Sequence, residues 1–233
     1  MTEAGASRLI RQMMRQSVKA ALSTSHAARD GWPYGSLVTV ACDVDAAPLL
    51  LLSDLSDHVK NLSGDSRASL LYDATGDGDE PLRGGRVTVL GRLIKTRQLG
   101  HRARFLARHP TAASYASFAD FNFYRMRIEA AHLVGGFGKI AWLSAGKLRV
   151  TPFDRKAWAA GDAQLAARLN SRYAALVAAA IGRRAATNLA VRAVDPDGLD
   201  ISVGQRLTRL EFTAPAATPR AVVGSLKRLA AAR

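Results

Sequence analysis

The stretch PLLLLSDLSDHVKNL, residues 48–62, decides the expected fold. Its first part is an apolar run between turn-forming residues, which indicates a buried strand over 48–53. Its second part is polar and predicts a short helix over 59–62. Backbone amides at the start of a helix attract anions, and hydroxyl, imidazole and ammonium groups gather at this point. The stretch therefore indicates a β-rich domain with a candidate phosphate site where a strand meets a helix.

Short strands continue on both sides of this stretch. Apolar and alternating runs bounded by turn residues predict strands over 20–25, 34–43, 67–73, 86–95 and 121–134. Gly91 lies inside one of these strands and indicates a bulge or a close backbone approach. Two helices, 98–108 and 111–118, are expected before the last strand, with Pro110 breaking them apart. About six strands with one helical interruption indicate a closed or partly open barrel rather than a doubly wound sheet.

Helices are expected at both ends of the chain. Residues 7–22 carry apolar side chains at helical spacing opposite arginines, which predicts an amphipathic packing helix. The later part of the chain predicts an alanine-rich helix over 163–181, strands over 188–193, 198–203 and 206–212, and a closing helix over 219–231. We therefore expect a mainly β, α+β chain with a barrel domain at 1–155 and a small α+β domain at 160–233.

Composition and charge narrow the classes of function. The 233 residues are 48% hydrophobic, enough for a real core, and the net charge is +14. The basic residues are spread along the chain without a recognition helix, zinc finger or ribonucleoprotein motif, so we expect a small phosphate-bearing ligand rather than a specific nucleic acid. Cys42 is the only cysteine, which excludes an intrachain disulfide and a cysteine-based zinc site.

Hydropathy gives no sign of a membrane protein. No segment approaches the roughly 20 apolar residues that a bilayer span needs. The N-terminal residues mix arginines with apolar side chains and lack the continuous apolar core of a secretory signal. We therefore expect a cytoplasmic protein.

Several segments together resemble a known family. Residues 33–38, 50–62 and 67–72 resemble the pyridoxamine 5'-phosphate oxidase-like split barrels. More narrowly, the chain resembles the haem-utilisation branch, the HugZ type. The sequence motifs of that branch match in the same order at residues 104–110, 118–124 and 132–139. The C-terminal part, from residue 160, resembles the small α+β module often fused behind that barrel. The resemblance implies a split β-barrel with flanking helices that forms a homodimer, with a cofactor near the subunit interface.

The resemblance also implies which residues bind the cofactor, with FMN as the first expectation. In flavin-binding relatives, side chains at the positions of Ser53 and Lys60 contact the phosphate, and the strand that carries Ser36 and Leu37 lines the cofactor edge. Arg86 falls where the oxidases place a glutamine near the flavin ring. The complete set expected to bind FMN is Ser36, Leu37, Ser53, Ser56, His58, Lys60, Asn61 and Arg86. An ordinary helix cap followed by a solvated turn is the alternative interpretation of residues 56–61.

Haem is the alternative cofactor. The haem-degrading relatives take their iron ligand from a histidine beyond the glycine-rich segment at 135–138, and this chain has no histidine after His132. Haem could still bind through His132, His58 or another group, with His132 as the candidate ligand if haem is bound; the alternative interpretation of a lone histidine beside an apolar strand is a structural residue. Asp120 lies in the segment where those relatives keep an aspartate near the haem site. In the trailing module, Tyr173 stands where the relatives have a histidine.

No side chain identifies itself from the sequence as a catalytic acid or base, so the catalytic residues are unknown and the sequence does not decide whether the protein is an enzyme. Three functions follow from the residues and the resemblance. The first is an FMN-binding protein acting as a flavin-dependent oxidoreductase on an unknown small molecule. The second is a haem-binding or haem-utilisation protein. The third is a regulatory or partner-binding module that has kept the fold without the chemistry.

Overall fold

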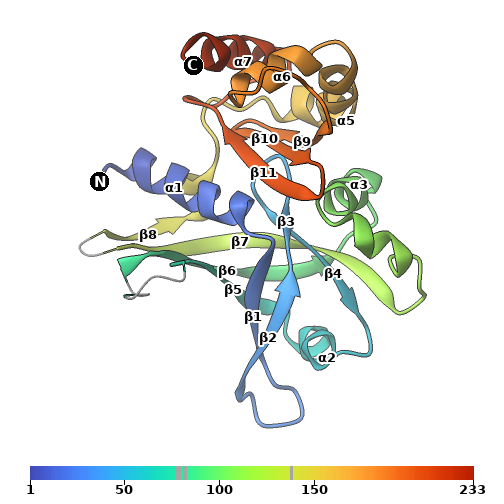
Figure 1. Ribbon diagram of the computed structural model, residues 1–233. Coiled ribbons are helices and arrows are strands. Elements are labelled where there is room, and N and C mark those ends of the chain that lie inside the picture. The colour runs from blue at the N-terminus through green and yellow to red at the C-terminus, as the bar shows by residue number, and fades with distance from the viewer. Residues whose placement is uncertain (77–79, 81–82, 137–138) are drawn as a thin grey trace. The chain divides into compact units, whose positions relative to one another are not determined.

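The computed structural model describes residues 1–76, 80, 83–136 and 139–233 (Figure 1). It divides into two compact units, Met1–Arg149 and Val150–Arg233, called here the barrel unit and the C-terminal unit. Residues 137–138, which belong to the motif at 132–139 that resembles the haem-utilisation branch, lie outside the described residues. The division into separate domains at 1–155 and 160–233 stays a prediction.

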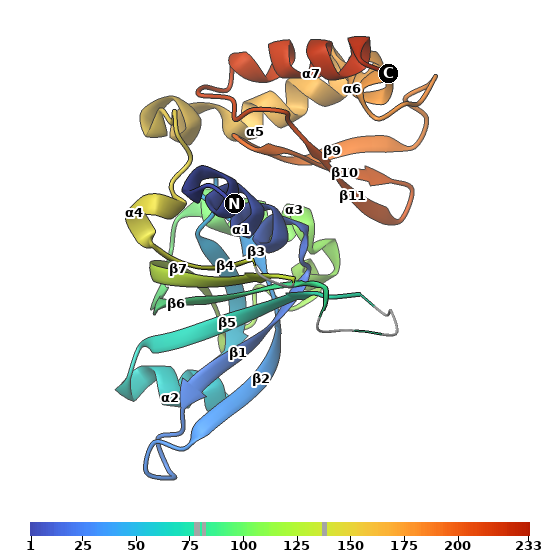
Figure 2. The same cartoon turned by 90° about the vertical axis from the view of Figure 1, so that its left-hand side faces the viewer.

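One antiparallel sheet of eight strands forms the barrel unit, and it curls into a half-barrel (Figures 1 and 2). The strand order is β2-β1-β5-β6-β7-β4-β3. The strand β8 pairs with the same edge of β7 as β4 does, further along β7. The bounds are β1 Lys19–Ser25, β2 Pro33–Thr39, β3 Ala41–Cys42, β4 Pro48–Ser53, β5 Arg67–Ala74, β6 Gly85–Lys95, β7 Phe121–Gly135 and β8 Ile140–Ser144. This architecture confirms the predicted split barrel, and β8 is a strand that the sequence did not indicate.

The core of the barrel unit lies on the inner face of the sheet. Strand register aligns Leu22, Leu70 and Val89 across β1, β5 and β6, and all three are fully buried. Alternation along each strand sends the neighbouring side chains to the opposite face. Ile10 and Met14 of helix α1, Glu3–Gln16, cover this inner row.

Helix α1 ends earlier than the predicted helix over 7–22. Ser17 is extended, and both its backbone N–H and its hydroxyl donate to the carbonyl oxygen of Met13, which closes the helix. Residues from Lys19 onward pair with β2 and β5 instead. The expectation was wrong here because cross-strand pairing outweighed the helical spacing of the apolar residues.

The described part of the barrel unit contains three further α-helices: α2 Asp57–Gly64, α3 Leu99–Arg108 and α4 Ala145–Leu148. The predicted helix over 111–118 is only a 3-10 turn, Pro110–Ser114. The Tyr115 ring then lies against the Phe121 ring, with centroids 4.9 Å apart and planes tilted by 52°, so the chain folds back toward β7 rather than continuing as a helix. Together, α3 and this turn cover the outer side of β4 through Phe105 and Leu51.

Gly91 marks the predicted irregularity in β6. The pairing of β6 with β7 changes register between Leu90 and Gly91, which is the signature of a bulge. A Cβ atom at Gly91 would clash with the backbone carbonyl of Arg127. The position therefore requires glycine because two backbones approach closely.

The C-terminal unit is the expected small α+β module. Its antiparallel sheet has the order β11-β10-β9, and its helices lie on one side of that sheet (Figure 2). The bounds are α5 Arg155–Ser171, α6 Ala174–Ala180, β9 Leu189–Asp195, β10 Gly198–Val203, β11 Arg206–Glu211 and α7 Ala221–Ala231. The predicted single helix over 163–181 is wrong because the chain leaves helical geometry at Tyr173, which separates α5 from α6.

Candidate functional site

The residues predicted to bind a cofactor lie on two different surfaces of the barrel unit. One group, called here the α2 cluster, gathers where β4 meets α2 and contains Ser36, Ser53, Ser56, His58, Lys60 and Asn61. The other group contains Leu37, Arg86 and His132, whose strand neighbours Val38, Val87 and Leu133 are buried on the inner face. Because side chains alternate along a strand, the second group lies on the outer face of the sheet.

Hydrogen bonds connect the α2 cluster to the rest of the barrel unit. The Ser36 hydroxyl lies 3.2 Å from Nδ1 of His58, and the Ser56 hydroxyl donates to the carbonyl oxygen of Ser53 at 2.6 Å. The buried Asn61 amide donates to the Thr24 hydroxyl at 3.0 Å. Burial lowers the pKa of His58, which favours its neutral form. These contacts tie α2 to β1 and β2.

Carboxylates surround Ser53 and Lys60, the two residues expected to contact a cofactor phosphate. The Ser53 hydroxyl donates to Oδ2 of Asp120 at 2.5 Å, and Lys60 pairs with Asp57 at 3.1 Å. Asp54, the residue after Ser53, accepts from Lys95 at 3.0 Å. The exposed Lys60 pair costs little to open, but a phosphate here would displace the Ser53–Asp120 bond and approach several negative charges. The α2 cluster therefore fits a structural role better than a flavin-phosphate site, and FMN binding is not confirmed.

The outer face carries a continuous row of side chains across six strands. Each residue of this outer row is the direct cross-strand partner of the next. In order from β2 to β8, the outer row is Leu37, Ala21, Leu71, Thr88, His132 and Trp142. Leu37 and Trp142 at its two ends are 70% and 62% exposed. Most sheet faces that meet water are polar, so this row is an unusual apolar surface.

His132 and Trp142 are neighbours in the outer row, and their rings are in contact. Their rings are stacked, with centroids 4.5 Å apart and planes 21° from parallel. The stacked indole limits the orientation of the imidazole ring. Because His132 is only half-buried, part of its side chain stays accessible. Arg86 lies two residues from Thr88 on β6, opposite Val134 in β7. A cation and an oriented imidazole thus share one apolar surface.

A pocket of about 450 Å³ opens beside the outer row. Hydroxyl groups from Ser23, Ser25 and Ser69 line it together with Leu90. Ser23, Ser69 and Leu90 are direct cross-strand partners, two positions along their strands from the members of the outer row. The outer face is therefore hollowed next to its apolar stripe, within the size range of ligand pockets.

A haem group makes three demands that the outer face can be tested against. It needs an imidazole for its iron, a flat apolar surface for its ring and cations for its propionates. His132 offers the imidazole, Trp142 and Leu71 offer apolar surface, and Arg86 offers positive charge. The residues of the outer face fit the group.

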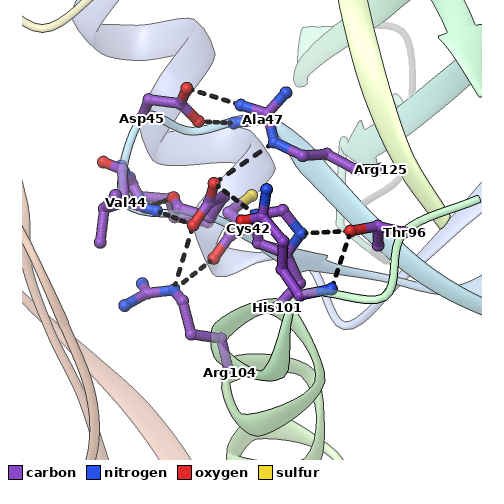
Figure 3. A network of polar contacts seen from close by, with 11 residues as sticks. Cys42, Val44, Asp45, Ala47, Thr96, His101, Arg104 and Arg125 are labelled. Atoms are coloured by element: carbon purple, nitrogen blue, oxygen red, sulfur yellow. Dashed lines mark hydrogen bonds and ion pairs between the residues drawn. The ribbon is translucent and has the colours of Figure 1, made fainter. Parts of the chain in front are cut away.

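The sequence did not indicate the polar cluster that centres on Asp43. Figure 3 labels its partners His101, Arg104 and Arg125. The carboxylate lies 3.3 Å from both His101 and Arg125 and 4.0 Å from Arg104. Burial alone would raise its pKa, but the hydrogen bond with His101 and the charge of Arg104 outweigh burial and hold the pKa well below its usual range. The partners lie far away along the chain, so no local pattern could have revealed them.

The Asp43 cluster has a structural role. His101 contacts both Asp43 and the Thr96 hydroxyl, at 3.3 and 2.8 Å, an arrangement that resembles an acid–base relay. However, the side chains of His101 and Asp43 are only 9% and 12% exposed, which leaves little room for a substrate. Arg104 also donates to the carbonyl oxygen of Cys42 at 3.1 Å. The cluster therefore fastens α3 to the turn between β3 and β4.

The described residues also bear on membranes and metals. Among residues 1–76, 80, 83–136 and 139–233, no helix is long and apolar enough to cross a bilayer. The same residues contain no group of three or more histidine, cysteine, aspartate or glutamate side chains placed to hold a metal ion. The cytoplasmic location stays a prediction.

Comparison with known proteins identifies relatives of the barrel unit. The family described as CREG, β-barrel matches residues 2–148. A curated relative is a non-canonical haem oxygenase, the chloroplastic protein HOZ of Arabidopsis thaliana, which is 33% identical over 141 residues. The match covers 59% of this chain but only 42% of the relative, so the chain spans less than half of that protein's length.

Solved structures extend the similarity to the whole chain. A protein of unknown function from Agrobacterium tumefaciens is 26% identical with a TM-score of 0.76, over 98% of this chain and 95% of that one. A haem-binding protein from Mycobacterium smegmatis is 25% identical with a TM-score of 0.57, over 100% and 97%. The protein ChuZ from Campylobacter jejuni, 15% identical with a TM-score of 0.54 over 63% and 62%, shares the fold. The fold and these matches confirm the resemblance to the HugZ-type split barrels, and the chain belongs to the CREG β-barrel family.

Proposed function

We propose that the protein binds haem on the outer face of its barrel unit, with His132 as the iron ligand. The observation that carries this proposal is the stacked His132–Trp142 pair inside the apolar outer row. The similarity to a haem-binding protein along the whole chain, and to a haem oxygenase along the barrel unit, supports the same cofactor. Haem binding therefore has more support than FMN binding.

Each residue of the proposed site has a distinct task. An imidazole nitrogen of His132 would hold the iron, and the stacked indole of Trp142 restricts the orientation of the imidazole ring. Leu71 and Leu37 cover apolar ring surface, and Arg86 meets a propionate. Bound haem supplies a redox-active iron. The described side chains of the outer row include no carboxylate or lysine that would act as a proton donor, so the proposal is binding and not a named reaction.

We also propose that the protein is a homodimer with its cofactor near the interface between the copies. Exposed apolar area supports this second proposal, because contiguous patches of this kind mark interaction surfaces. Leu37, Ile140 and Trp142 are each more than half exposed on the outer face, and Leu71 is 39% exposed. A second copy that packs on this face would remove these side chains from water and shield the proposed haem site.

Absorption titrations with haemin test the haem proposal. The purified protein is expected to develop a Soret band that saturates, and the variant His132→Ala is expected to bind haemin at least about tenfold more weakly, since even the loss of a group that supports a metal ligand typically costs about 10–100-fold in affinity. His58→Ala, in the α2 cluster, is the matched control and is expected to bind like the unchanged protein. Added imidazole is expected to restore the spectrum of His132→Ala, which separates a lost ligand from a misfolded sheet.

Other outcomes would favour the other functions. An unchanged Soret band and affinity in His132→Ala would exclude His132 as the ligand. A flavin spectrum with FMN that is lost in Lys60→Ala would support the FMN-dependent oxidoreductase instead. A protein that binds neither haemin nor FMN would support the regulatory or partner-binding module.

A further inference from the structure

The C-terminal unit contains a large pocket of its own. Its volume is about 750 Å³, within the range of small-molecule sites. One helical face of α5 forms one wall, and the segment that leads into α7 forms the other. Neither the family resemblance nor the haem proposal gives this pocket a role.

The walls of the pocket are mainly apolar. Leu165, 6% exposed, and Ala157 project from α5, while Pro219 and Val223 face them from the start of α7. At Gly161 an added Cβ atom would lie 3.2 Å from Cγ of Pro219, so the glycine lets the two walls approach closely. Such a surface excludes water from the apolar body of a ligand.

Two arginines provide the charge in the pocket. Arg168 of α5 and Arg220, the residue before α7, both line it. Neither makes an ion pair with another described residue, and the described lining residues include no carboxylate. In the same unit, by contrast, the buried Arg209 contacts three carboxylates at 2.7 to 3.0 Å. Arg168 and Arg220 are exposed and have no counter-ion among the described residues of the unit, whereas the charge of Arg209 is fully compensated.

We propose that this pocket binds an organic anion, a carboxylate or phosphate carried on an apolar body. The two guanidinium groups hold the anionic head through charge-assisted hydrogen bonds, and Leu165, Val223 and their neighbours cover the body. The first turn of α7, an 11-residue helix, adds its partial positive charge at the same end. The inference is independent of haem binding because it uses only residues of the C-terminal unit.

A natural reporter lies next to the pocket. Trp158 follows the pocket residue Ala157, is fully buried, and donates from Nε1 to the carbonyl oxygen of Ala217 at 3.1 Å. The chain has only two other tryptophans, Trp32 and Trp142, and both are exposed. The variant W32F/W142F therefore leaves a single tryptophan whose emission reports on this pocket, and it removes the indole ring of the proposed haem site.

Titration of W32F/W142F with dodecanoate, followed by Trp158 emission, tests the proposal. A saturable change is expected, and its affinity is expected to fall as salt is raised. Adding R168Q/R220Q is expected to weaken binding about tenfold or more, the typical value of a charge-assisted contact. The matched control R184Q/R206Q removes the same charge from exposed positions of the unit outside the pocket and is expected to stay within about twofold.

Three results would overturn the proposal. The first is a Trp158 emission that dodecanoate leaves unchanged. The second is equal weakening in R168Q/R220Q and R184Q/R206Q, which would mean that net charge alone attracts the ligand. The third is binding of inorganic phosphate as tight as that of dodecanoate, which would show that the apolar walls contribute nothing. Circular dichroism checks that each variant is folded before titration.

Discussion

The buried carboxylate of Asp43 gives the sharpest test of what stabilises the barrel unit. The variant Asp43→Asn keeps the shape of the side chain and removes its charge. Arg104 then stays 8% exposed without the carboxylate that lies 4.0 Å from it. We expect a large loss of stability because the substitution removes the buried negative charge that contacts His101, Arg104 and Arg125.

The size of the loss follows from the contacts of Asp43. Removing one partner from a buried ion pair typically costs about 3–5 kcal/mol. The amide oxygen of asparagine can still accept the Val44 N–H, which now donates to the carboxylate at 2.8 Å. Arg125 also keeps its second partner, Asp45, at 2.6 Å. The lower end of the range therefore applies, and a loss of about 3 kcal/mol lowers the melting temperature by roughly 6–12 °C in a protein of this size.

The pH dependence of this loss has a definite sign. The pKa of Asp43 is lower in the folded protein than its ordinary value of 3.8. A depressed carboxylate pKa stabilises the folded state above the unfolded pKa, and this stabilisation is lost as pH falls toward the folded pKa. The stability difference between the unchanged protein and Asp43→Asn should be constant from about pH 7 to 5 and narrow below about pH 4.

Urea denaturation followed by circular dichroism at pH 7, 5 and 3.5 measures this difference. Asp57→Asn is the matched control, because that carboxylate pairs with Lys60 on the surface, where both side chains are at least half exposed. The control is expected to show no measurable change. A difference below about 0.5 kcal/mol for Asp43→Asn at pH 7, the usual size of surface substitutions, or a difference that does not narrow in acid, would refute the reasoning.

Two further predictions concern the sheet. Leu71→Asp puts a charge in the middle of the outer row and is expected to convert the proposed homodimer into a monomer in sedimentation velocity experiments; an unchanged protein that is already monomeric at micromolar concentration would contradict the dimer. Gly91→Ala is expected to cost about 1–3 kcal/mol in urea denaturation because its Cβ meets the carbonyl of Arg127. Gly146→Ala is its control, since nothing lies within 4 Å of an added Cβ there, and equal stability of the two variants would argue against a strained bulge.

Local patterns were enough to predict most strands of the barrel unit. The apolar run over 48–53 coincides with β4, since a strand buried on both faces has a continuous apolar sequence. The bulge at Gly91 was equally visible, because a glycine weakens the interior of a strand and often marks a bulge or a close backbone approach. The end of α1 could not be predicted, because residues 18–22 fit the spacing of a helix as well as that of a strand. Only their pairing with β2 and β5 decides between helix and strand.

The candidate site could be predicted residue by residue but not as a surface. Leu37, Arg86 and His132 were each expected near a cofactor, and strand register brings them to one face. Register depends on pairings between distant segments, which a single sequence does not reveal. Trp142 was not expected at all, because β8 is short and its alternation covers only five residues, Ile140–Ser144.

The contrast between the two groups of predicted residues is the physical reason for preferring the outer face as the binding surface. In the α2 cluster the polar groups already contact protein partners: the Ser53 hydroxyl contacts Asp120, and the Asn61 amide contacts Thr24. A ligand there would have to replace bonds that the fold has made. On the outer face, Leu37 and Trp142 remain in water. Covering them gains free energy, so binding is favoured where the fold leaves apolar surface uncovered.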